Sequence, residues 1–277
     1  MISAKNITKR FGSRTVLSDI SLNITPSDSI AFIGRNGSGK STLLKILAGL
    51  LPCEKGQLIH SKKLKFAYVP ERFPPINLSA LDYITQIGQI SGLSKKDAIT
   101  KGNHLFEALF MQDMTQTPIK YLSKGTMQKV AVVQAFLVTP DVLLLDEPIA
   151  GQDMASQRVF MDMVNQLNSN HGVAVLCSCH EDYMVNAIAK TVYEIIDGKL
   201  HQKEHTRGEA NISRLLFYQN HQTPIPETIL NQALKIEQLQ GNEVAIYVET
   251  SITSHIIKEM LCNNNFKLGG VNNERFY

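Results

Sequence analysis

The sequence lacks a strong excess of charge of either sign. Its 277 residues carry 28 Lys and Arg against 25 Asp and Glu, a formal net charge of +3. A bias this small gives no electrostatic ground for binding nucleic acid, and we expect no such partner. The densest basic run, residues 61–65, lies where a hairpin turn is expected, so a solvated turn is a better interpretation than a phosphate-binding patch.

Cysteine is scarce, with four in the whole chain. Their spacing matches neither a zinc site nor the disulfide framework of a small secreted protein. Cys177 and Cys179 are two positions apart, so on a strand they would share one face. Buried, reduced thiols are the preferred interpretation, with a redox pair as the alternative.

Long apolar runs are also missing. No stretch approaches the ~20 apolar residues that a membrane-spanning helix requires. The first residues include Lys5, Lys9 and Arg10 but no apolar core of a signal peptide. We therefore expect a soluble, cytoplasmic chain, and any work at a membrane would need another subunit to provide the spans.

What is present is enough apolar sequence, 43% of the chain, to bury one large core and a smaller appendage. Residues 1–205 alternate strand-like and helix-like segments, which predicts an α/β domain. Between about residues 72 and 139 this alternation gives way to helical periodicity. We interpret that stretch as an inserted helical subdomain.

Several strands can be predicted individually. Continuous apolar runs at 29–34, 141–146 and 173–178 are typical of buried parallel strands. Two short strands are expected on either side of the basic run. Residues 191–202 predict a hairpin whose Asp197–Gly198 turn favours type I′ geometry.

The composition changes after about residue 205, so we expect a second region at 206–277. Residues 205–229 are polar and interrupted by Pro224 and Pro226, which predicts a helix and a linker. The remainder suggests a small α+β appendage of the order β-β-α-β.

A glycine-rich stretch, GRNGSGKST at 34–42, matches G-x-x-x-x-G-K-[ST] between a predicted strand and a helix. Its glycines let successive backbone N–H groups face phosphate oxygens, and the helix N-terminus adds a positive dipole. Lys40 can reach the β- and γ-phosphates, and Ser41 can ligate Mg²⁺. The expected nucleotide contacts are Gly34, Arg35, Asn36, Gly37, Ser38, Gly39, Lys40, Ser41 and Thr42.

Two carboxylates end the apolar strand VLLLDEP at 142–148. Asp146 lies where a phosphate-binding α/β fold needs a magnesium anchor, and Glu147 points towards an attacking water as a general base. His180 follows another predicted strand at the same edge of the sheet. It is interpreted as a contact to the γ-phosphate or water, with an ordinary structural histidine as the alternative.

These motifs, together with LSKGTMQKV at 122–130, IAGQD at 149–153 and CSCHE at 177–181, occur in the order and approximate spacing of an ABC-type ATPase. Residues 1–205 thus resemble the nucleotide-binding subunit of ABC transporters. The resemblance implies a P-loop NTPase core of ABC type, a mixed sheet flanked by helices with an inserted helical subdomain. It also implies ATP and Mg²⁺ as ligands.

The resemblance assigns three further positions. Phe11 would stack on adenine, although a core aromatic is an equal alternative from spacing. Glu71 occupies the Q-loop position, where the family usually has Gln. Asp153 belongs to the D-loop, near the dimer partner.

Residues 123–126 occupy the signature position, usually written LSGGQ. In the family, two subunits enclose two ATP molecules head to tail, and the signature of one completes the site of the other. Ser123 and Gly125 retain the family residues, whereas Lys124 and Thr126 replace Gly and Gln. A plain N-capped helix does not explain a glycine in its first turn, where it costs stability.

The function that the resemblance implies is ATP hydrolysis in a transporter, with Glu147, His180 and Lys40 as the catalytic residues. The subunit would work as a homo- or heterodimer, on the inner face of the cell membrane, with separately encoded membrane subunits. The short appendage and altered signature suggest export of a peptide, antibiotic or lipid. The alternative is a soluble ABC ATPase in translation, repair or regulation.

Overall fold

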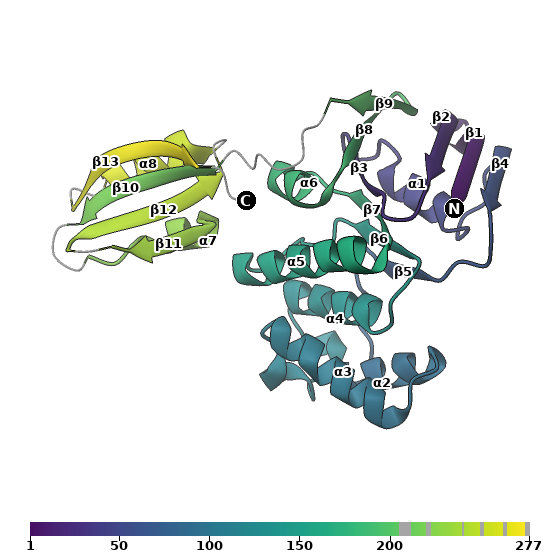
Figure 1. The fold of residues 1–277 in the computed structure, drawn as a ribbon, viewed down its shortest axis with the longest axis horizontal. Coiled ribbons are helices and arrows are strands. Elements are labelled where there is room, and N and C mark those ends of the chain that lie inside the picture. The colour runs from purple at the N-terminus through teal and green to yellow at the C-terminus, as the bar shows by residue number, and fades with distance from the viewer. Residues whose placement is uncertain (205–211, 220–222, 240, 250–251, 263–264, 275–277) are drawn as a thin grey trace. The chain divides into compact units, whose positions relative to one another are not determined.

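The chain forms two compact units, Met1–His205 and Thr206–Tyr277. The computed structural model describes residues 1–204, 212–219, 223–239, 241–249, 252–262 and 265–274. Each unit has its own β-sheet structure (Figure 1) and its own core.

The first unit is built on a six-stranded sheet of order β5-β6-β7-β3-β8-β9. Its strands are β3 (Ser29–Ile33), β5 (Phe66–Val69), β6 (Val142–Asp146), β7 (Ala174–Ser178), β8 (Thr191–Ile196) and β9 (Lys199–Lys203). All neighbours pair in parallel except β8 and β9, which form the predicted hairpin. Asp197 and Gly198 both have positive φ, 48° and 76°, which confirms the expected type I′ geometry.

The apolar strands of this sheet are buried on both faces. On β6, Leu143 and Leu145 belong to one core, whereas Val142 and Leu144 belong to another. Such two-sided burial explains why β6 reads as a continuous apolar run rather than an alternating one. Cys177, in β7, and Cys179, just after it, are buried free thiols, as expected.

A second, antiparallel sheet of order β2-β1-β4 packs in the core that also contains helix α1 (Lys40–Leu47). Its strands are β1 (Ile2–Phe11), β2 (Arg14–Ile24) and β4 (Lys55–His60). The predicted hairpin across the basic run is therefore wrong, because β4 pairs with β1 while β5 pairs in parallel with β6. The run crosses between the two sheets, and Asp141 holds it by accepting from Lys62 Nζ at 2.9 Å and Lys65 N at 2.8 Å.

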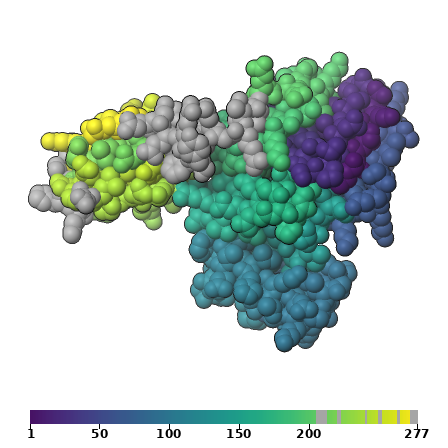
Figure 2. Space-filling model, viewed as in Figure 1, coloured from purple at the N-terminus to yellow at the C-terminus, as the bar shows by residue number. Residues whose placement is uncertain are grey.

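The helical block forms a lobe of the first unit (Figure 2). It contains α2 (Ala80–Ile90), α3 (Lys95–Ala108), the 3-10 turns η1 (Gln112–Met114) and η2 (Ile119–Tyr121), and α4 (Lys124–Phe136). Ser79, Ser94 and Ser123 cap the three α-helices, each accepting a hydrogen bond at 3.1 Å from the backbone N–H three residues later. Helices α5 (Met154–His171) and α6 (Asp182–Ile188) join α4 in the core on this side of the sheet.

The second unit is an antiparallel sheet of order β11-β12-β10-β13 with two helices. Its elements are β10 (Ile212–Gln219), α7 (Glu227–Gln232), β11 (Lys235–Gln238), β12 (Glu243–Glu249), α8 (Thr253–Cys262) and β13 (Phe266–Glu274). Its core includes Leu215, Phe217, Ile246 and Ile256. The arrangement is the split β-α-β of ferredoxin-like folds.

Of the helix and linker predicted across 205–229, the helix is wrong at 212–219, whereas residues 223–226 have no regular secondary structure, as a linker would. Residues 212–219 form β10, which lies between β12 and β13. Buried Ser213, Leu215 and Phe217 alternate with more exposed neighbours, a period of two that fits a strand. Residues 205–211 and 220–222 lie outside the described residues. The predicted β-β-α-β order matches β11, β12, α8 and β13.

In the part of the chain that the structure describes, no helix has the length and apolar character to cross a membrane.

Candidate functional site

The candidate site begins at the loop that joins β3 to α1. Gly34, Gly37 and Gly39 have φ values of 141°, 75° and 109°, which side chains rarely tolerate. Arg35 and Asn36 are exposed in this loop, and Thr42 is half-buried in the first turn of α1. The buried Ser38 Oγ has no hydrogen-bond partner among the described residues. A buried hydroxyl beside a loop of N–H groups fits an oxyanion ligand, as the motif predicts.

The ammonium group of Lys40 lies against the backbone of this loop. The Nζ donates to the carbonyl oxygens of Gly34 at 3.0 Å and Arg35 at 3.4 Å. It also lies 3.0 Å from His180 Nε2 and 3.9 Å from Glu147 Oε1. The residue is only 6% exposed, so its cation is held in place by these partners.

Asp146, at the end of β6, is the polar centre of the site. Its buried carboxylate accepts from Ser41 Oγ at 2.7 Å, Ser178 Oγ at 2.6 Å and Tyr68 Oη at 2.8 Å. The structure thus brings the two predicted magnesium ligands, Ser41 and Asp146, together. Hydroxyl and carboxylate oxygens are the donors that Mg²⁺ prefers, so this pair fits the ion.

Sequence reasoning missed Tyr68 and Ser178. They lie on β5 and β7, the two strands that flank β6. Burial, and then the neighbouring Asp146 carboxylate, raise the pKa of the Tyr68 phenol well above its usual range, so it acts as a donor. Their position near the carboxyl ends of parallel strands was the available signal.

Glu147 follows Asp146 with its backbone in the left-handed region, φ 48°. Its N–H donates to the Ser178 carbonyl oxygen at 3.0 Å, and its Oε1 lies 3.1 Å from His180 Nε2. Burial raises the pKa of the Glu147 carboxyl to about 7, although the Lys40 ammonium opposes the rise. The residue therefore titrates near neutral pH, which suits a general base.

Phe11 ends β1 with 53% of its surface exposed, and Lys9 Nζ lies 5.2 Å from the centre of its ring. The alternative of a core aromatic is therefore wrong, and the ring is accessible to a ligand. Sequence reasoning missed Arg14, which donates from Nη2 to the Gly37 carbonyl oxygen at 3.2 Å and so links β2 to the glycine-rich loop.

Glu71 is exposed in the segment after β5, and its Oε1 lies 3.6 Å from Arg72 Nε. The guanidinium next in sequence partly offsets the negative charge that Glu71 brings in place of the usual Gln. Glu71 nevertheless contributes to the raised pKa of the Glu147 carboxyl, so its charge is felt at the site.

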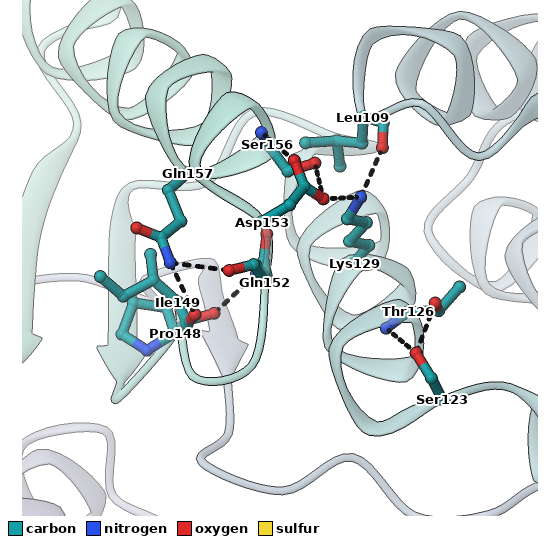
Figure 3. A network of polar contacts seen from close by, with 10 residues as sticks. All are labelled: Leu109, Ser123, Thr126, Lys129, Pro148, Ile149, Gln152, Asp153, Ser156 and Gln157. Atoms are coloured by element: carbon teal, nitrogen blue, oxygen red, sulfur yellow. Dashed lines mark hydrogen bonds and ion pairs between the residues drawn. The ribbon is translucent and has the colours of Figure 1, made fainter. Parts of the chain in front are cut away.

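The signature residues belong to a second group, at the start of α4 (Figure 3). Ser123 Oγ accepts from the Thr126 N–H at 3.1 Å and lies 2.7 Å from the Thr126 hydroxyl. Lys124 is exposed, whereas Gly125 is buried. The Thr126 hydroxyl thus contacts the capping serine. The usual motif has at this position a glutamine, whose amide lies at the end of a longer side chain.

Gly125 has a reason within its own chain. A Cβ at this position would lie 1.9 Å from the carbonyl oxygen of Gly151, so only glycine allows the first turn of α4 to approach the D-loop this closely. A plain N-capped helix does not explain this glycine, as expected from the sequence, but the close approach of α4 to the D-loop gives it a structural reason. Backbone contact with residue 151 requires it whether or not a phosphate approaches.

Asp153 ends the D-loop and caps α5, accepting from the Ser156 N–H at 2.9 Å. Its Oδ2 also accepts from Lys129 Nζ at 2.7 Å. Burial alone would raise its pKa, but the hydrogen bonds from Lys129 and Ser156 lower the pKa of Asp153 to about 2. Asp153 therefore stays ionised and joins the D-loop to the signature helix.

Two groups of predicted residues thus emerge. Lys40, Ser41, Asp146, Glu147 and His180 converge around the ends of β3, β6 and β7. The signature and Asp153 form the other group, joined through Gly125 and Gly151.

Comparisons with known proteins agree on one family. A family model described as "ABC transporter" matches residues 17–150. The zinc import ATP-binding protein ZnuC of Hydrogenovibrio crunogenus is 30% identical over 192 residues, 67% of this chain and 74% of the relative. The protein of that name from Haemophilus influenzae is 35% identical over 194 residues, covering 69% and 70%.

Solved structures show the same fold. An ATP-binding subunit of an ABC transporter has a TM-score of 0.67 at 24% identity, covering 73% of this chain and 89% of that one. A dimeric ATP-binding cassette in a post-hydrolysis state, bound to ADP and Pi, has a TM-score of 0.68 at 22% identity, covering 75% and 100%.

Proposed function

Because this chain belongs to the ATP-binding subunits of ABC transporters, which are ATPases, we propose that two copies pair head to tail and drive import through separate membrane subunits. The observation that carries the proposal is the convergence of Lys40, Ser41, Asp146, Glu147 and His180 around one loop that fits phosphate.

ATP binding uses groups that the glycine-rich loop and the start of α1 already provide. The N–H groups of residues 34–39, the Ser38 hydroxyl and the Lys40 ammonium together offer donors and positive charge to the triphosphate. Lys40 exchanges its carbonyl partners for phosphate oxygens on binding, which keeps its buried charge compensated. Phe11 supplies an exposed ring for the adenine.

Ser41 and Asp146 would hold Mg²⁺, which neutralises developing charge on the transferred phosphate. Ser178 and Tyr68 orient the Asp146 carboxylate by donating hydrogen bonds to it. These partners fix the direction of the carboxylate lone pairs.

Glu147 removes a proton from the attacking water. Its partial burial and raised pKa let it hold that proton near neutral pH. His180, 3.1 Å from the same carboxylate, orients it and lies 3.0 Å from Lys40, so it also faces the position of the terminal phosphate.

Pairing would present Ser123 and the α4 N-terminus of one copy to the nucleotide of the other. The support is the capped, glycine-containing first turn of α4, together with a fold shared with a dimeric cassette. A helix N-terminus favours a bound phosphate.

The membrane subunit would dock on the helical lobe. A pocket there is lined by Arg72, Phe73, Lys124, Met127 and Gln128. Its two cations and two apolar side chains suit a partner segment that carries an acidic and an apolar residue.

Import replaces the export expected from the short appendage and the altered signature. The names of the relatives, which are zinc import proteins, favour import over that expectation. Zinc is the first cargo to test.

The test combines turnover with transport. Glu147→Gln should reduce ATP hydrolysis by about 100-fold or more while leaving nucleotide binding intact, because it removes the base but keeps the side-chain shape. The wild-type chain should co-purify with a multi-span membrane protein from detergent extract, and its loss should reduce zinc uptake by cells. Equal turnover of the two proteins would refute the catalytic assignment, and a chain without a membrane partner would favour the soluble ATPase.

A further inference from the structure

Lys129 is a buried cation that the proposed reaction does not use. It lies in the middle of α4, with its side chain 9% exposed. Burial of an unpaired ammonium is costly, so its partners indicate what it does. Those partners come from two other segments of the first unit.

The ammonium bridges the D-loop and the end of α3 (Figure 3). It donates to Asp153 Oδ2 at 2.7 Å and to the carbonyl oxygen of Leu109, the C-cap of α3, at 3.1 Å. A single side chain of the signature helix thus holds the D-loop on one side and the helical lobe on the other.

The D-loop and α4 touch at a second place. The carbonyl of Gly151 in the D-loop packs against Gly125. Gly151 lies between Glu147 and Asp153 in the sequence. Contacts at both Gly125 and Lys129, one helical turn apart, prevent the D-loop from pivoting on the first turn of α4.

The D-loop is also held from its other side. Gln152 Nε2 donates to the Pro148 carbonyl oxygen at 2.8 Å, and Gln157 Nε2 donates to the Gln152 carbonyl oxygen at 2.8 Å. These hydrogen bonds brace the loop between Glu147 and α5, and Lys129 connects the loop to the signature helix.

We propose that Lys129 is a positioning residue that holds the signature serine and the D-loop of one chain as a single unit, so that both engage the partner's ATP together. The inference rests on the proposed pairing. The Leu109 and Asp153 partners of the Lys129 ammonium lie outside the glycine-rich loop of its own chain, and its effect is exerted on the partner's site through Ser123 and Asp153. The low pKa of Asp153 keeps its carboxylate ionised near neutral pH.

The first measurement needs no pairing. Lys129→Met keeps the length and apolar stem of the side chain but removes its donors. Hydrogen exchange of the full-length, nucleotide-free chain should accelerate together in residues 149–153, the first turn of α4 and residues 109–111. Lys129→Arg should restore protection, and Lys101→Met, at an exposed lysine of α3, is the matched control. Unchanged exchange in Lys129→Met overturns the tether.

The second measurement asks in which site Lys129 acts. Two differently tagged copies are co-purified as mixed dimers, and single-turnover ATP hydrolysis is measured. In the split dimer, Lys129→Met is in one copy and Glu147→Gln in the other. In the same-chain dimer, both substitutions are in one copy and the partner is wild type.

If Lys129 acts on the partner's site, the split dimer should hydrolyse ATP about 10- to 100-fold faster than the same-chain dimer, because it retains one site with an intact base and an intact signature. The same-chain dimer has one site without its base and one site facing the altered signature. Lys129→Met should leave the nucleotide affinity of the single chain unchanged while weakening ATP-driven pairing in a Glu147→Gln background.

The outcomes separate the two proposals. A same-chain dimer faster than the split dimer, or equal rates in the two, overturns the role of Lys129 while leaving the ATPase intact. A Glu147→Gln protein that still hydrolyses ATP overturns the proposed catalytic base instead. Failure of the wild-type copies to pair on ATP overturns both the pairing and the action of Lys129 across it.

Discussion

At the scale of single residues, Glu147 links the structure to a pH dependence. Its carboxyl has a pKa of about 7 because burial disfavours the charged form. Only the ionised form accepts a proton, so kcat/KM for ATP should rise about tenfold per pH unit below 7 and level off above it. Steady-state hydrolysis between pH 5.5 and 8.5 measures this.

The same shift has a consequence for stability. The folded state binds this proton more tightly than the unfolded chain, in which the pKa of the carboxyl is 4.5. The stabilisation from the protonated group is complete below that value and is lost as the pH rises to about 7. Glu147→Gln should remove this pH-dependent part of the stability. A wild-type kcat/KM that is flat from pH 5.5 to 8.5 would contradict the assignment of Glu147 as the base.

Residue identities at the site were the most predictable feature of the chain. Lys40, Ser41 and Asp146 could be found because each follows a recognisable strand or begins a helix, and the structure brings them together. Tyr68 and Ser178 were missed, because a hydroxyl near the carboxyl end of a strand is a weak signal until the order of the strands is known. Their importance depends on which strands flank β6, a property of sheet order.

At the scale of secondary-structure elements, the contact between α4 and the D-loop makes a specific prediction. Gly125→Ala would place a Cβ 1.9 Å from the Gly151 carbonyl oxygen. Because both sides of this contact are backbone, relief requires an element to move. We expect a loss of about 1–3 kcal/mol in the free energy of unfolding.

Urea denaturation of the purified chain measures that loss. Lys124→Ala, at the exposed neighbour in the same turn, is the control and should change stability by no more than about 0.5 kcal/mol. A Gly125→Ala protein as stable as the control would show that α4 and the D-loop can separate freely.

The pairing of a strand was harder to predict from the sequence than its existence. β4 and β5 were both predicted as strands, but their pairing was wrong because an edge position in one of two sheets depends on distant segments. β10 was missed because Pro224 and Pro226 and the polar flanks outweighed a period-two pattern of eight residues. Central strands of small antiparallel sheets carry weaker apolar signals than β6, since one face of such a sheet need not be buried.

At the scale of the whole molecule, the two units have separate cores. The core of the second unit draws its residues from 215 to 266, and the two cores of the first unit draw theirs from 2 to 195. Because each unit has a core of its own among the described residues, we expect two thermal unfolding transitions in calorimetry. ATP with Mg²⁺ at a hundredfold excess over Kd should stabilise one of them by about 2.7 kcal/mol.

Residues 1–205 expressed alone should retain that ligand-sensitive transition and lose the other. A single transition in the full chain that ATP shifts as a whole would contradict independent folding of the units.

The left-handed backbone of Glu147 has a meaning for how this sequence can change over time. A non-glycine residue at φ 48° carries strain, and Asn or Gly would relieve it at this position. Random variants ranked by heat resistance would therefore favour replacements of the side chain proposed as the base. Selection for heat resistance and selection for turnover would then favour different residues at position 147.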